Sequence, residues 1–303
     1  MAAVGQPRPL REGGGGGGGG GGGRRDLKRL IEVAPGFYNV RGKFTLLGGL
    51  LNLGTHMSLC LLQSGKYLVI DTIKLDDEIR HEICSITDNG KLIEAVIATH
   101  PYHTLAFRDF FAAFPHAPYY GTPRHLDVIK DIPWKGEIMA NKSRWEPEIE
   151  MRIPDGSEFV LPLPPKTNHF SNVFVLHKAS KTIHNDDCVL VWNNPPLLLK
   201  IFGFRDGDMS FHPSIKGPGL YPTCQAPSAF REWVKRLLVE WDFDNICTAH
   251  NGNCIGGAKE KLRATLERAE PLLEKLIKRN SKAKPPKDFG AWSTKESDPP
   301  ECG

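Results

Sequence analysis

The chain has 303 residues, of which 40% are hydrophobic and 24% are charged, and its formal net charge is +4. This composition is typical of a globular protein, and so small a charge, spread along the chain, argues against nucleic acid and membrane surfaces as partners. No segment approaches the ~18 consecutive apolar residues of a membrane span. The N-terminus also lacks the apolar core of a signal peptide, so we expect a cytoplasmic protein.

Both ends of the chain have the composition of disordered segments. Residues 13–23 are eleven consecutive glycines, which have no side chains to bury. Residues 281–303 are polar and contain two Pro-Pro pairs. We therefore predict a disordered tail over residues 1–25, one folded domain over residues 26–280 and a second disordered tail over residues 281–303.

Apolar runs and turn residues predict alternating strands and helices. Residues 56–62 and 67–72 flank a glycine-containing turn and predict a β-hairpin. A helix over residues 75–87 and a strand over residues 92–98 follow. The next predicted helix carries an aromatic stripe that we interpret as core: Phe107, Phe110, Phe111 and Phe114. Further strands are predicted at residues 117–120, 158–163, 173–176 and 181–191, and a short helix at residues 123–129.

The last third of the chain is mainly helical in pattern. Residues 203–221 are rich in Gly, Pro and Asp and predict a long loop. The segment after Pro227 has apolar residues at helical spacing over three turns, from Phe230 to Trp241. A strand at residues 245–249 and a helix at residues 258–279 complete a mixed α/β order of elements.

Potential metal ligands lie next to several predicted strands. They are Asp71, His100, His103, His169, Asp186, Asp187 and His250. In a layered α/β protein the carboxyl ends of strands meet at one edge, so side chains far apart in sequence can lie together there. His and Asp are ligands that a catalytic zinc or iron uses. Each residue alone is explained as readily by a turn or a helix cap, and only their joint position favours a metal site.

In their order along residues 35–280, these residues resemble the motifs of the metallo-β-lactamase superfamily. Asp71 ends a strand, as the first aspartate of that family does, and Thr99-His100 begins a segment similar to T-H-x-H-x-D-H. His169, Asp187 and His250 stand where the family has its later histidine, aspartate and histidine. The resemblance implies an α/β fold of the four-layer αββα sandwich type, with His100, His169, Asp187 and His250 as metal ligands.

The chain departs from the family pattern within the histidine motif. Tyr102 stands where the family has a histidine, and Thr104 and Leu105 replace the motif's aspartate and last histidine. Each of the family's two metal positions would then keep only two protein ligands, which seldom hold zinc firmly. If His103 turned inward, however, it could complete one site with His100, His169, Asp187 and His250.

Two functions are compatible with these residues. The first is a divergent family member with a degenerate metal site, weakly catalytic or non-catalytic, that serves as a scaffold for a small ligand or a partner. The alternative is a hydrolase of an ester, thioester or phosphoester that activates water with zinc or iron, with Asp187 as a ligand or catalytic base. The sequence leaves open the substrate, the oligomeric state, the presence of a metal, and whether Asp186 or Asp187 faces the site.

Overall fold

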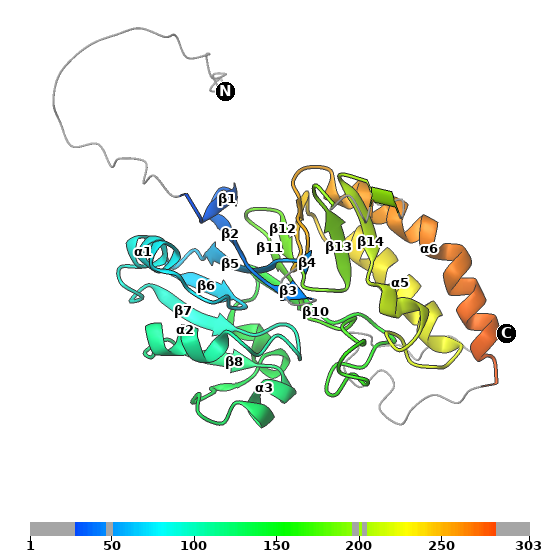
Figure 1. The fold of residues 1–303 in the computed structure, drawn as a ribbon, viewed down its shortest axis with the longest axis horizontal. Helices are drawn as coiled ribbons and strands as arrows, with labels where there is room; N and C mark the ends of the chain where they lie inside the picture. Colours follow the sequence, from blue (N-terminus) through cyan, green and yellow to red (C-terminus); the bar gives the residue numbers. More distant parts are fainter. Residues whose placement is uncertain (1–27, 47–50, 196–199, 202–204, 283–303) are drawn as a thin grey trace, which may run out of the picture.

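The computed structural model describes residues 28–46, 51–195, 200–201 and 205–282. The predicted N-terminal tail, residues 1–25, lies outside the described residues, and so does the predicted C-terminal tail, residues 281–303, apart from residues 281–282. The division into two tails and one domain stays a prediction. The described residues form an αββα sandwich, in which two β-sheets lie face to face and helices cover their outer faces (Figure 1).

The first half of the chain forms a seven-stranded sheet in the order β1-β2-β5-β6-β7-β8-β9. Its strands are β1 (Ile31–Ala34), β2 (Phe37–Gly42), β5 (Thr55–Leu61), β6 (Tyr67–Ile70), β7 (Ile93–Ile97), β8 (Tyr119–Gly121) and β9 (Gly136–Glu137). The antiparallel pairing of β5 with β6 confirms the predicted hairpin. Because β6 to β9 are parallel, the carboxyl ends of β6 and β7 lie side by side.

Helices cover the outer face of this sheet, as the periodicity predicts. They are α1 (Asp77–Ile86), α2 (Phe107–Ala113) and α3 (Pro123–Val128). Asp76 begins α1, where its side chain accepts a hydrogen bond of 2.8 Å from the Ile79 N–H. In α2, Phe107 and Phe110 are fully buried, which confirms the aromatic stripe as core. A two-stranded ribbon of β3 (Thr45–Leu46) and β4 (Leu51–Asn52) extends from β2 and β5.

The second half of the chain forms a five-stranded sheet in the order β10-β11-β12-β15-β16. Its strands are β10 (Ile149–Arg152), β11 (Phe174–His177), β12 (Thr182–His184), β15 (Asn245–Cys247) and β16 (Asn253–Cys254), beside a ribbon of β13 (Val189–Trp192) and β14 (Asp208–Phe211). Strands β12 and β15 are parallel, so their carboxyl ends also meet. Short 3-10 helices occur at η2 (Met139–Arg144) and η3 (Pro213–Lys216).

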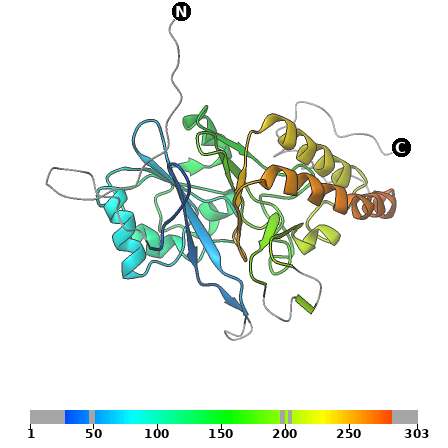
Figure 2. The same cartoon turned by 90° about the horizontal axis from the view of Figure 1, so that it is seen from above.

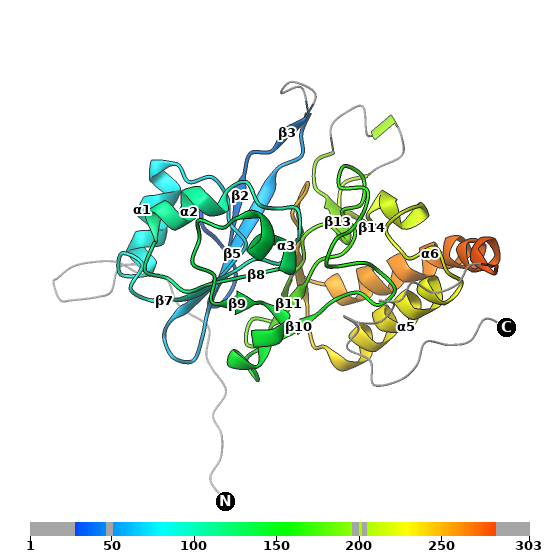
Figure 3. The same ribbon diagram turned by 90° about the horizontal axis from the view of Figure 1, so that it is seen from below.

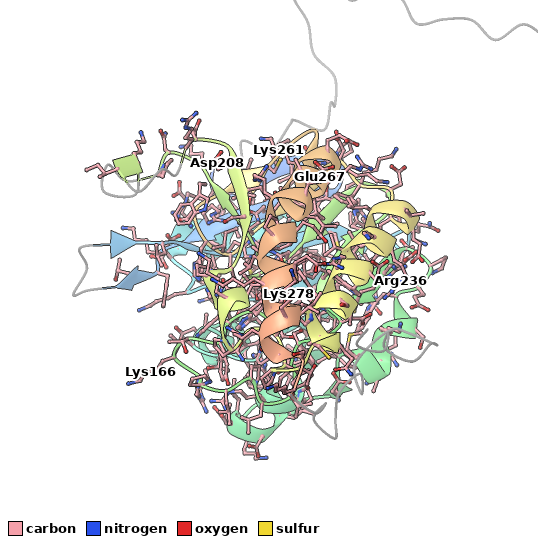
Figure 4. All side chains as sticks on the ribbon, turned by 90° about the vertical axis from the view of Figure 1, so that its right-hand side faces the viewer. Lys166, Asp208, Arg236, Lys261, Glu267 and Lys278 are labelled. Carbon is pink, nitrogen blue, oxygen red and sulfur yellow. The ribbon has the colours of Figure 1, made fainter. Side chains whose placement is uncertain are left out.

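Helices α5 (Gln225–Glu240) and α6 (Ala258–Asn280) run side by side on the outer face of the second sheet (Figure 2). The labelled side chains Lys261, Glu267 and Lys278 of α6 lie on its solvent side (Figure 4). The opposite side of α6 buries Leu262, Leu266 and Leu273, in agreement with the apolar stripe in the sequence. None of the helices in the described part of the chain combines the length and the apolar character needed to cross a bilayer.

Figure 3 shows the helices on the outer sides of the two sheets. Three hydrophobic clusters fill the three spaces between these four layers. One lies under α1 and α2, one lies between the two sheets, and one lies under α5 and α6. In β6, Val69 belongs to the helix-side cluster, whereas Leu68 and Ile70 belong to the cluster between the sheets. Successive side chains of a strand point to opposite faces, so an interior strand of a sandwich must be apolar on both.

Three predicted segments differ from the structure. The strand predicted at residues 158–163 is wrong, because Glu158 Oε1 accepts hydrogen bonds from the N–H groups of Val160 (2.6 Å) and Leu161 (3.2 Å) that a strand would use for pairing. The long loop predicted at residues 203–221 contains β14 and η3. The run at residues 181–191 is split between β12 and β13, which belong to different sheets.

The aromatic stripe of α2 generates a test of the core assignment. Phe110 is fully buried, whereas Phe111 on the same helix is half-buried beside Tyr119. We predict that Phe110→Ala lowers the free energy of unfolding by about 3–5 kcal/mol, because it leaves a cavity under the sheet. Phe111→Ala, the matched control, should cost less. If urea unfolding gave the same loss of unfolding free energy for both variants, the assignment of Phe110 to the core would be contradicted.

Candidate metal centre

Five polar side chains that the sequence singles out converge on one point at the strand ends. His100 follows β7, Asp187 lies between β12 and β13, and His250 follows β15. The carboxylate oxygens of Asp187 lie 3.5 Å from His100 Nε2, 3.1 Å from His103 Nε2, 3.4 Å from His169 Nδ1 and 3.1 Å from His250 Nε2. His250 approaches Oδ1, and the other three rings approach Oδ2. Asp187, rather than Asp186, is therefore the residue at the centre.

A turn at the end of β12 determines which way the two aspartates face. Asn185 closes this turn, since its side-chain amide donates to the Val189 carbonyl (2.8 Å) and accepts from the Val189 N–H (3.3 Å). Its backbone N–H donates to the Cys247 carbonyl of β15 (2.9 Å). Asp187 thus reaches His250, whereas Asp186 reaches His56 on β5, with Asp186 Oδ1 3.2 Å from His56 Nε2.

The altered histidine motif turns His103 inward. The His103 N–H donates to the His100 carbonyl (3.1 Å), which closes a tight turn after β7. The rings of His100 and His103 then stack with centroids 4.2 Å apart. Leu105, which replaces a motif histidine, points to solvent with 83% of its surface exposed. Among residues 101–105, His103 is therefore the one that adds a second imidazole ring, after that of His100, to the group around Asp187.

Hydrogen bonds to their outer nitrogens orient three of the histidines. His103 Nδ1 lies 3.0 Å from Asp186 Oδ2, His169 Nε2 lies 2.9 Å from the Pro165 carbonyl, and His250 Nδ1 lies 2.7 Å from the Gly54 carbonyl. Oxygen acceptors at these positions require the outer nitrogen to carry the proton. The other nitrogen of each ring is then the one that faces Asp187. This is the arrangement that outer-shell oxygens give to histidine ligands in metal sites.

His100 has the opposite arrangement. Its Nδ1 accepts a hydrogen bond from the Tyr102 N–H (3.1 Å), so in the neutral ring Nε2 carries the proton. Nε2 lies 3.3 Å from the His169 carbonyl. Burial, and next the charge of His103, hold the pKa of His100 well below its ordinary value. In this tautomer the proton on His100 Nε2 faces the His169 carbonyl, so His100 supports the His169 loop and does not offer Nε2 to a cation.

Asp187 is a buried carboxylate with no hydrogen bond of normal geometry to the described residues at either oxygen. It is 1% exposed, yet four imidazole nitrogens lie between 3.1 and 3.5 Å away. Burial opposes its ionisation, but the attraction of His250 and His103 outweighs burial and holds the pKa of Asp187 well below its ordinary value. A carboxylate of this kind needs a cation. The donor set therefore fits a metal ion.

His103 supplies the compensating positive charge when no metal is bound. Its ring bridges the two carboxylates, with Nδ1 3.0 Å from Asp186 and Nε2 3.1 Å from Asp187. Burial lowers the pKa of His103, but both carboxylates raise it, and the net pKa lies well above the ordinary value. A metal ion that binds Nε2 must displace this proton.

The cluster opens into a cavity of about 370 Å³. Three of the histidines, His103, His169 and His250, line it, and the other lining residues are Lys43, Phe44, Thr55, Thr72, Ile73, Lys74, Tyr102, Leu105, Ala106 and Asp109. The Phe44 ring stacks on His250 with centroids 5.7 Å apart. Solvent molecules and a small ligand can therefore reach the histidines, but the fully buried His100 does not line the cavity.

Sequence reasoning did not identify two histidines behind the site. His56 on β5 and His184 on β12 are fully buried and stack with ring centroids 4.1 Å apart. Each stands next to an apolar residue within a buried strand, which is the signal that could have identified them. Asp71, which the sequence did single out, binds His184 Nε2 (2.9 Å) and the Thr99 N–H (2.8 Å) instead of facing the cavity.

Arg41 on β2 holds the turn that carries His250. Its guanidinium donates to the carbonyls of Thr248 and Ala249, the latter at 2.9 Å. Burial lowers the pKa of Arg41 to about 10. The Asn251 N–H also donates to the Leu53 carbonyl (2.9 Å), so the first sheet anchors a loop of the second.

Comparisons with known proteins identify the fold alone. No protein-family model and no curated protein matches the sequence. Among solved structures, a putative diflavin flavoprotein A 5 fragment from Nostoc sp. PCC 7120 matches with a TM-score of 0.52 and 11% identity, covering 82% of this chain and 96% of that one. VMB-1 matches with a TM-score of 0.51 and 14% identity, covering 82% of this chain and 100% of that one. A metallo-β-lactamase from Erythrobacter litoralis matches with a TM-score of 0.50 and 13% identity, covering 79% and 96%.

The anchoring of the His250 turn predicts a stability effect. Arg41→Met should lower the free energy of unfolding by about 1–3 kcal/mol, because the Thr248 and Ala249 carbonyls lose their donor. Arg108 forms an exposed ion pair with Asp131 (2.7 Å), and Arg108→Met should cost much less. If urea unfolding gave the same loss for both variants, Arg41 would not be the anchor.

Proposed function

The chain has the fold of the metallo-β-lactamases, and we propose that it binds one zinc or iron ion and hydrolyses a small ester, thioester or phosphoester. The observation that carries this proposal is Asp187, a buried carboxylate without a hydrogen bond of normal geometry to the described residues. It faces three histidines whose outer nitrogens are bound by oxygen acceptors. A metal ion there supplies Lewis-acid polarisation of a carbonyl or phosphoryl oxygen.

We propose His103 Nε2, His169 Nδ1 and Asp187 Oδ2 as the main ligands. One donor atom from each of these three residues, and one from His100, all lie within 4.8 Å of one another. Three protein ligands are the number that catalytic zinc sites use. His250 approaches Asp187 from its other oxygen, at 3.1 Å, and would be a further ligand or a charge partner of the carboxylate.

In this proposal Asp187 is a ligand rather than a catalytic base. A general base works best when its pKa is near the working pH. The pKa of Asp187 is held well below its ordinary value, despite burial, by His250 and His103. A carboxylate with so little affinity for a proton suits a metal ligand.

The cavity walls favour a substrate with an apolar part and an anionic group. Phe44, Ile73 and Leu105 provide apolar surface. Lys43 and Lys74 provide two cationic side chains, while Asp109 adds one negative charge. The volume of about 370 Å³ admits a small organic substrate.

The second candidate is a non-catalytic scaffold with a degenerate site. Leu105 favours it, since this residue replaces a motif histidine with a side chain that has no donor atom and is 83% exposed. On this reading His103 is a permanent cation between Asp186 and Asp187 and takes the place of the metal.

Zinc titration against a chromophoric chelator separates the two candidates. We predict that the parent protein binds about one zinc per chain. His169→Ala and Asp187→Asn should weaken binding by more than the roughly 10–100-fold caused by losing an outer-shell partner. His100→Ala should fall within that smaller range, because His100 supports the His169 loop.

The exposed His81 provides the matched control, and His81→Ala should bind zinc like the parent. A parent protein that remains metal-free at saturating zinc would rule out the metal site and leave the scaffold. Equal losses from His100→Ala and His169→Ala would mean that the proposed ligand assignment is wrong.

Activity of the zinc-loaded protein is the second test. We predict zinc-dependent hydrolysis of at least one of 4-nitrophenyl acetate, an acetylated thiol and bis(4-nitrophenyl) phosphate. Asp187→Asn should abolish it, because the ion loses its carboxylate. If the loaded parent were no faster than Asp187→Asn on every substrate, the hydrolase proposal would fail even with zinc bound.

A further inference from the structure

A second cluster of potential ligands lies directly behind the metal centre. His56, His184 and Asp186 are fully buried, and one donor atom from each lies within 4.8 Å of the others. Their residue types are the same as those of the centre around Asp187. The contacts of the two clusters differ, however, and these contacts indicate what the inner cluster does.

Every polar atom of the inner cluster has a partner within the described residues. Asn39 Nδ2, a donor, lies 3.2 Å from His56 Nδ1, so His56 Nε2 carries the proton and donates to Asp186 Oδ1 (3.2 Å). His184 Nε2 serves a different carboxylate, Asp71 Oδ2, at 2.9 Å. A nitrogen that carries a proton cannot bind a metal at the same time. The inner cluster therefore has no nitrogen lone pair facing Asp186, whereas His169 Nδ1 and His250 Nε2 of the outer cluster face Asp187 with theirs.

Asp186 connects the inner cluster to the metal centre. Its Oδ1 accepts from His56 Nε2 (3.2 Å), and its Oδ2 faces His103 Nδ1 (3.0 Å) and the Thr99 hydroxyl (3.2 Å). The side chain is fully buried, and its partners come from two segments, β5 and the turn after β7. It has little freedom to move, so His103 Nδ1 meets a fixed acceptor.

From these contacts we infer that Asp186 is a positioning residue that turns His103 into the metal centre, that His56 fixes Asp186, and that the inner cluster binds no metal of its own. The first part rests on the proposed function, since it assigns His103 as a ligand. It also accounts for the altered motif. The fourth residue of His100-Pro101-Tyr102-His103 reaches the centre because an acceptor behind it holds its outer nitrogen.

Asp186→Asn is the informative variant, because it keeps the shape of the side chain. An amide presents one oxygen and one NH2 group, so it cannot accept from both His56 Nε2 and His103 Nδ1. His177→Asn is the matched control. His177 is also a buried strand histidine, bonded to the Ser180 hydroxyl (2.8 Å) and the Leu61 carbonyl (3.1 Å), and it has no contact with the cluster.

The first readout needs no metal. Diethyl pyrocarbonate modifies histidine rings, and peptide mass spectrometry gives the rate at His103 relative to the exposed His81. In the metal-free parent both nitrogens of His103 face carboxylates, so its modification should be slow. We expect Asp186→Asn and His56→Gln to accelerate it several-fold and His177→Asn to leave it unchanged. An unchanged rate in Asp186→Asn would overturn the positioning role.

The second readout is zinc binding. Asp186→Asn should weaken it by roughly 10–100-fold, as expected for an outer-shell partner of a histidine ligand, while the stoichiometry stays the same. Two zinc ions in the parent, with one lost in His56→Gln, would overturn the inference that the inner cluster holds no metal. A parent that binds no zinc would defeat the proposed function alone, because the modification rates still test the positioning of His103.

Discussion

The burial of the Asp187 carboxylate is the constraint on which the rest of the site depends. An ionised group that is 1% exposed must be compensated by charge or by hydrogen bonds, and its oxygens have no hydrogen bond of normal geometry to the described residues. Four imidazole rings surround it instead. In the metal-free protein the positive charge on His103 provides the compensation, and that proton occupies the nitrogen that a metal ion would use. A proton and a metal ion therefore compete for the same atom, His103 Nε2.

The αββα sandwich brings these groups together through its parallel strand pairs. The carboxyl ends of β6 and β7 carry Asp71 and the turn of His100 and His103, and those of β12 and β15 carry Asp187 and His250. The hydrophobic cluster between the sheets fixes the distance between the two pairs. Buried polar contacts then cross this boundary, as Arg41 does from β2 to the turn after β15. The fold determines which segments meet, and hydrogen bonds determine which atom of each ring faces inward.

Sequence reasoning could identify the fold and the candidate site residues because both depend on order along the chain. Hairpin, helix and interior-strand patterns follow from local periodicity, and four of the five candidate residues follow from motif positions. His103 is the exception, since it lies beside the motif positions rather than at one of them. The strand predicted at residues 158–163 failed because the Glu158 side chain takes over the backbone donors, which is a contact that periodicity does not encode.

The orientation of the site residues could not be predicted from the sequence either. Asp186 and Asp187 are neighbours of the same type, and only the turn closed by Asn185 sends one to each cluster. The different arrangement at His100 depends on the Tyr102 N–H, a contact between backbone and ring two residues apart. His56 and His184 have no position in the family motifs, and their importance follows only from their contact with Asp186 and Asp71.

The position of a bound ion tests the central claim most directly. Crystals grown with zinc, and measured on both sides of its absorption edge, would locate the ion by its anomalous scattering. The account predicts one peak, about 2.0–2.2 Å from His103 Nε2, His169 Nδ1 and an oxygen of Asp187. A peak between His56, His184 and Asp186, or no peak while His103 still bridges the two aspartates, would contradict it.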